Sequence, residues 1–206
     1  IAASGTKGLF SMGGIEWELK FDSGCESIIP SNSGVFAVDG SGNILHVSSG
    51  GDVMNSRHIG PVDIIEASEN GLLIGLGLID GRLMILDEDL QILHESLPAD
   101  DDVETISCIQ FRTDEILIVG RNSLGMTVDD RPENRLECWS HVNGMINTSE
   151  MPSKPTSFCA TEDGVMVGCF NGELVYLTIG IEGHEIISQM DYKISDITRW
   201  GNTFLV

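Results

Sequence analysis

Two short acidic runs contain the residues whose type and spacing could do chemistry. The first lies within "PADDDVE", residues 98–104, and the second within "LGMTVDDRPEN", residues 124–134. Clustered carboxylates can bind Ca²⁺, which takes about 6 to 8 oxygen ligands, or can contact lysine and arginine side chains of a partner. They can also be ordinary solvated loops of an acidic protein. The candidate binding residues are Asp100, Asp101, Asp102, Asp129, Asp130 and Glu133.

The remaining reactive residues do not form a recognisable catalytic or metal motif. The stretch "DGSGN", residues 39–43, resembles the opening of a calcium loop but lacks the downstream glutamate ligand, so we expect a hairpin turn there. The five histidines are scattered, and no Ser/His/Asp or Cys/His arrangement stands out. We therefore expect no catalytic residues, no metal and no cofactor.

The cysteines predict free thiols rather than a metal or disulfide framework. There are five, with no CxxC pair and no nearby CxH spacing. Cys108, Cys159 and Cys169 stand within apolar runs, where a thiol behaves as a small hydrophobic group. Reduced core cysteines indicate a cytoplasmic protein. A disulfide between Cys159 and Cys169 across a hairpin is the alternative.

The charge balance restricts the class of partner. The chain has 11 basic and 32 acidic residues, a formal net charge of −21. Such a surface repels phosphate backbones and anionic lipids, which argues against nucleic acid and membrane partners. No segment approaches the roughly 18 to 20 apolar residues of a membrane span. A basic protein, or another subunit, is the partner that this charge favours.

A repeat of about forty residues organises the elements that would position these groups. The segments "VFAVDGSGNILHVSS", "LLIGLGLIDGRLMILDED" and "VMVGCFNGELVYLTIG" each contain apolar runs around a glycine turn, and another apolar run precedes each segment. Gly42 and Gly81 are 39 residues apart, and Gly81 and Gly172 are 91 apart, so a fourth unit with an insertion lies between them. Periods of this length indicate solenoids or propellers, here with four strands per unit.

The two ends of the chain together have the length of one more unit. Counted across the join, Gly201 and Gly34 are again 39 residues apart. Two accounts fit: a closed ring whose last blade is shared by N- and C-terminal strands, which would remove exposed strand edges, or a piece of a larger ring. In the first account the break falls within or beside one strand, "NTFLV" followed by "IAAS".

This pattern resembles the WD40 and PQQ-like β-propeller superfamilies over essentially the whole chain. The chain has no Trp-Asp dipeptide, the WD40 signature, whereas Trp17 and Trp139 look like the strand-end tryptophans of PQQ-like repeats. The other units lack that tryptophan, so the resemblance implies the fold and not the quinone cofactor. We predict an all-β fold, one β-propeller domain over residues 1–206 with about five four-stranded antiparallel blades. The expected blades are residues 24–59, 60–98, 99–147, 148–190, and 191–206 completed by 1–23.

In propellers, the loop between the second and third strands projects on the same face as the connection between blades. The resemblance therefore implies that the two acidic loops lie side by side. Loops on a rigid scaffold are common binding sites, so we predict a non-catalytic protein-interaction scaffold with an acidic face. The alternative is a five-bladed glycan-binding or glycan-hydrolysing protein whose first strands line the channel with carboxylates. The carboxylates available there are Glu26, Asp63, Glu66, Glu104 and Asp196.

Overall fold

The computed structural model describes residues 2–5, 8–11, 17–96, 104–123, 132–161, 163–178, 183–200 and 203–206. Within these ranges all the regular secondary-structure elements are β-strands, which confirms the all-β prediction. Sixteen of the strands form four antiparallel sheets of four strands each. We name these sheets blades 1 to 4 in chain order.

Each blade uses consecutive strands of the chain. Blade 1 contains β4 (Cys25–Pro30), β5 (Gly34–Asp39), β6 (Asn43–Ser48) and β7 (Val53–His58). Blade 2 contains β8 (Val62–Ala67), β9 (Leu73–Leu78), β10 (Leu83–Asp87) and β11 (Ile92–Ser96). Blade 3 contains β12 (Glu104–Thr113), β13 (Ile116–Ser123), β14 (Asn134–Ser140) and β15 (Gly144–Glu150). Blade 4 contains β16 (Pro155–Ala160), β17 (Gly164–Cys169), β18 (Glu173–Thr178) and β19 (His184–Gln189).

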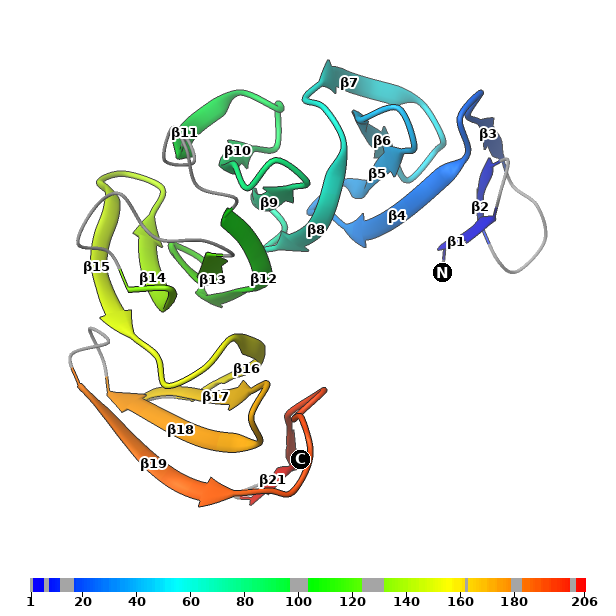
Figure 1. Cartoon of the computed structure of the whole chain (residues 1–206). Helices are drawn as coiled ribbons and strands as arrows, with labels where there is room; N and C mark the ends of the chain where they lie inside the picture. The colour runs from blue at the N-terminus through cyan, green and yellow to red at the C-terminus, as the bar shows by residue number, and fades with distance from the viewer. Residues whose placement is uncertain are drawn as a thin grey trace.

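The blades follow one another along an arc (Figure 1). The first strand of each blade lies on the inner side of the arc and the fourth strand on the outer side (Figure 1). Successive inner strands contact one another, β4 with β8, β8 with β12, and β12 with β16. Strand β15 extends beyond the expected boundary at residue 147, because its pairing with β14 continues to Arg135 and Glu150.

The ends of the chain form two further, smaller sheets. Strands β1 (Ala2–Gly5), β2 (Gly8–Ser11) and β3 (Glu18–Lys20) form one, and β20 (Thr198–Trp200) and β21 (Thr203–Leu205) form the other. These are separate sheets, and the two chain ends lie apart across the opening of the arc (Figure 1). The described strands thus do not make a shared fifth blade. They fit the second account, an arc of a larger ring.

Packing between blades explains the apolar runs of the sequence. Strands β9 and β17 are buried along their whole length. Blades 1 and 3 cover the two faces of β9, whereas β17 lies between blade 3 and the C-terminal segment that contains Ile194 and Ile197. In the outer strand β7, by contrast, exposed residues alternate with half-buried ones. Buried clusters join adjacent blades, and one of them packs Trp139 of blade 3 against Leu83 and Ile85 of blade 2. Trp139 is therefore an inter-blade packing residue.

The hairpin turns between second and third strands need glycine for two reasons. Gly81 has a φ of +81°, which side-chain-bearing residues rarely adopt, and a Cβ there would lie 2.3 Å from the carbonyl oxygen of Glu104. In blade 1 the positive φ belongs to Gly42, at +84°. The turn of blade 2 therefore packs directly against the start of β12.

Candidate functional site

The register of blade 3 joins the attachment points of the two acidic loops. Glu104, the first residue of β12, pairs with Ser123, the last residue of β13. The loop 97–103 thus ends where the insertion 124–131 begins. The backbone N–H of Ser123, which precedes the insertion, donates to the carbonyl oxygen of Glu133, which follows it, over 2.8 Å. We call this end of blade 3, bounded by Glu104, Ser123 and Glu133, the acidic loop site.

Of the six predicted binding residues, the structure describes Glu133, which is exposed. Asp100, Asp101, Asp102, Asp129 and Asp130 lie outside the described residues. The insertion also contains one basic residue, Arg131. Their role in binding therefore remains a prediction, for which the described part supplies the two anchoring strand ends.

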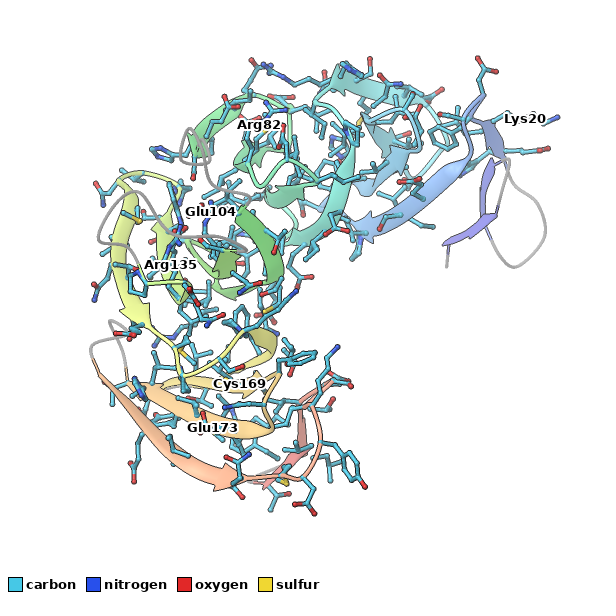
Figure 2. The ribbon with its side chains drawn as sticks, viewed as in Figure 1. Lys20, Arg82, Glu104, Arg135, Cys169 and Glu173 are labelled. Carbon is cyan, nitrogen blue, oxygen red and sulfur yellow. The ribbon has the colours of Figure 1, made fainter. Side chains whose placement is uncertain are left out.

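Directly beneath the acidic loop site lies a buried network of two arginines and two glutamates. Arg135 donates from Nη2 to Glu104 over 2.7 Å and from Nε to Glu137 over 2.9 Å. Arg121 donates from Nε to Glu137 over 2.8 Å and lies 3.5 Å from Glu104. All four residues are at most 4% exposed. Figure 2 shows Glu104 and Arg135 facing each other within blade 3.

The network balances the cost of burying its charges. Burial alone would raise the pKa of the Glu137 carboxyl, but Arg121, Arg135 and the indole N–H of Trp139 hold that pKa below its ordinary value. Trp139 Nε1 donates to Glu137 over 2.9 Å. Two positive and two negative groups, with each carboxylate contacted by both guanidinium groups, satisfy the condition under which buried ion pairs are tolerated.

Arg121 also ties blade 3 to blade 2. Its Nη1 donates to the carbonyl oxygen of Gly81 over 2.7 Å, and its Nη2 donates to Ser96 Oγ over 2.9 Å. Gly81 belongs to the hairpin turn of blade 2, and Ser96 ends the last strand of that blade. The network therefore fixes the start of β12, the end of β13 and the adjacent blade relative to one another.

The carboxylates that the glycan alternative would use lie in different surroundings. Glu104 is not a free channel carboxylate: it is 3% exposed and bound by two arginines. Glu26 and Asp63 are exposed and line the same hollow of about 340 Å³ between β4 and β8. Burial raises the pKa of Glu66, whereas Asp196 is exposed. A ring of free carboxylates from all the inner strands is therefore not formed by the described residues.

The expected free thiols are confirmed. All five cysteines are free, and Cys159 pairs across the hairpin with Met166 rather than with Cys169, which excludes the alternative disulfide. Burial raises the pKa of Cys108 and of Cys169 to about 12, so both are poor nucleophiles. Within the described ranges, histidine, cysteine and acidic side chains form no group of three or more that could hold a metal ion. No helix among these residues is long and apolar enough to cross a membrane.

Sequence reasoning missed the buried charge network. A usable signal is present in "NRLECW", where Arg135 and Glu137 alternate with apolar residues in a strand-like run. Charges in such a strand must find partners on a neighbouring strand. The partner Arg121 occupies the position directly opposite Arg135 in the register of β13 and β14, which the sequence alone does not fix.

Comparison with known proteins supports the fold. No protein-family model and no curated protein sequence matches this chain. The computationally designed protein Ika8 is similar in structure, with a TM-score of 0.74 and 14% identity over 98% of this chain and 63% of that chain. Sqt1 from Chaetomium thermophilum, in its complex with the N-terminus of ribosomal protein L10, gives a TM-score of 0.68 and 11% identity over 96% of this chain and 61% of that chain.

The WD40 repeats of RRP9 are also similar, with a TM-score of 0.60 and 14% identity over 82% of this chain and 52% of that chain. The chain thus spans between 52% and 63% of the length of these structures. At such identities the comparisons show the fold and not a function. Together with the four blades and their arc, they show that the described chain has the fold of part of a β-propeller, similar to that of the RRP9 WD40 repeats.

Proposed function

We propose that this chain is a non-catalytic protein-interaction scaffold whose acidic loop site binds a basic segment of a partner protein. The observation that carries the proposal is the pairing of Glu104 with Ser123, which starts both acidic loops from adjacent backbone positions. Asp100 to Asp102 and the pair Asp129 and Asp130 then belong to loops that share one end of blade 3. Two clusters of carboxylates on neighbouring loops present more negative charge to a cationic segment than either loop alone.

The whole chain supports the sign of the partner's charge. A net charge of −21 on 206 residues gives a negative field that attracts cationic segments and accelerates their association. The fold is compatible with this role, because WD40-type propellers commonly serve as protein-interaction scaffolds. Sqt1, which shares the fold, is bound in its structure to the N-terminus of a ribosomal protein. That complex is a precedent for the capture of a terminal peptide by such a scaffold.

The proposal is tested by measuring the affinity of the protein for a synthetic oligolysine peptide by calorimetry. Replacing Asp100, Asp101 and Asp102 by asparagine should weaken binding roughly tenfold, because exposed ion pairs contribute up to about 1 kcal/mol each. The binding should also fall steeply between about 0.02 M and 0.5 M salt, since salt screens exposed charges.

A matched control removes three charges from the opposite end of the blades. Glu69, Glu115 and Asp163 are exposed and lie in the turns between the first and second strands of blades 2, 3 and 4. The triple variant Glu69→Gln, Glu115→Gln, Asp163→Asn should bind the peptide nearly as well as the unmodified protein. Equal weakening by the two triple variants would show that only net charge matters and would refute the proposed site.

A further inference from the structure

Next to the acidic loop site, blade 3 contains a cavity on the face that it turns towards blade 2. The cavity has a volume of about 240 Å³ and its apolar walls come from Pro132, Trp139 and Met145. Ser96 of blade 2 closes one side, and Thr148 of β15 stands at another. An apolar protein cavity of about 150 Å³ is large enough to bind benzene, so this one can hold an aliphatic or aromatic side chain. We call it the blade 2–3 cavity.

The charged floor of the cavity does not call for a charged ligand. Arg135 and Glu137 line it, and both belong to the buried network. Glu137 already accepts hydrogen bonds from Arg121, Arg135 and Trp139. A ligand carboxylate or ammonium group would have to displace one of these buried partners, which is costly. The free walls are apolar, so the group that fits is an apolar one.

The rim of the cavity is acidic and continuous with the acidic loop site. Pro132, a wall residue, directly precedes the exposed Glu133. Glu150 is exposed and lies two residues after Thr148 on β15, so both side chains point to the same face of the strand. A segment bound at the acidic loops can therefore reach the cavity with a neighbouring residue, and the residues beside that anchor meet carboxylates.

We propose that the blade 2–3 cavity receives one apolar side chain of the partner segment, so that the recognised sequence is an aliphatic or aromatic residue flanked by lysine or arginine. This inference rests on the proposed function and specifies its partner. Basic flanking residues supply attraction to the acidic rim, and the buried apolar residue supplies selectivity. Anchors of this kind in desolvated pockets dominate the affinity of many protein interfaces.

The test compares two synthetic heptapeptides, each with two lysines, glycine, a central residue, glycine and two lysines. The central residue is leucine in one peptide and alanine in the other. The unmodified protein should bind the leucine peptide on the order of tenfold more tightly, because leucine buries more apolar surface than alanine. Thr148→Phe, at an exposed position on the cavity wall, should abolish this preference by filling the cavity. Thr148→Ala leaves the cavity open and should keep the preference.

The outcomes separate this inference from the proposed function. Equal affinity of the unmodified protein for both peptides, with loss of binding on removing the charges of Asp100 to Asp102, would overturn the cavity assignment and leave the acidic loop site standing. A leucine preference that Thr148→Phe removes, with no effect of the loop charges, would support the cavity and overturn the proposed function. A leucine preference that survives Thr148→Phe would also overturn the cavity assignment, and failure to bind either peptide at low salt would overturn both.

Discussion

At the scale of single residues, Asp39 shows how a sequence that resembles a calcium loop becomes a turn. Its Oδ1 accepts hydrogen bonds of 2.9 Å from the backbone N–H groups of Ser41 and Asn43 and from the Ser41 hydroxyl. Its Oδ2 accepts a further one from the Asn43 side chain. Both carboxylate oxygens are thus used within the hairpin, as the absence of a downstream glutamate in the sequence suggested.

These hydrogen bonds make the stability of the hairpin depend on pH. Burial would raise the pKa of Asp39, but the bonds from Asn43 and Ser41 lower it from 3.8 to about 2. Because the pKa is lowered on folding, the stabilisation is complete above about pH 4 and is lost as the pH falls through about 2. Asp39→Ala should cost roughly 1 to 2 kcal/mol at neutral pH, and the cost should shrink as the pH falls below 4.

Urea unfolding of the Asp39→Ala variant between pH 7 and pH 2.5 measures this prediction. Asp191→Ala removes one charge from an exposed linker position and is the control for net charge. A cost at Asp39 that stays constant down to pH 2.5 would mean that the folded carboxyl is not stabilised in its charged form.

The buried arginines define a second residue-scale prediction. Arg121→Leu removes one of the two arginines that contact the buried carboxylates of Glu104 and Glu137, so it should cost about 3 to 5 kcal/mol. Arg82→Leu is the matched control, because Arg82 forms ion pairs with Asp80 and Glu95 near the surface, which contribute about 0 to 1 kcal/mol. Denaturant unfolding of both variants checks the difference, and equal costs would contradict the stabilising role of the network.

At the scale of the elements, the hairpin turns were predictable and the strand register was not. The spacing of Gly42, Gly81 and Gly172 predicts the turns, because a tight hairpin needs glycine at a positive φ. The pairing of Arg121 with Arg135 depends on how β13 and β14 align across the insertion. Local sequence does not encode that alignment. The sequence therefore identifies Glu104 as a candidate carboxylate but does not predict the network that binds it.

The turn of blade 2 gives the prediction at this scale. Gly81→Ala combines an unfavourable φ with a Cβ placed 2.3 Å from the Glu104 carbonyl oxygen. Gly183→Ala meets the same unfavourable φ, here +75°, with nothing within 4 Å. We expect Gly183→Ala to cost about 1 kcal/mol and Gly81→Ala clearly more, since the backbone of β12 must shift. Thermal unfolding of both variants separates strain in φ from crowding, and similar costs would contradict the tight packing of this turn.

At the scale of the whole molecule, the repeat predicted the blades and left their closure open. A period of about forty residues specifies four-stranded units because each unit must bury its faces against neighbours. The repeat does not specify how the strands at the two chain ends pair with each other. These strands form separate sheets of three and two strands instead of one shared blade. The similar structures extend well beyond the length of this chain, in agreement with an arc of a larger ring.

At this scale, the proposed scaffold binds a cationic segment at one end of blade 3. The most direct measurement couples the amines of the oligolysine peptide to protein carboxyl groups with a carbodiimide and maps the adducts by mass spectrometry. The account predicts adducts concentrated on Asp100 to Asp102, Asp129, Asp130 and Glu133, and suppressed by high salt. Adducts distributed equally over the exposed Glu69, Glu115 and Asp163 at the opposite end of the blades would contradict it.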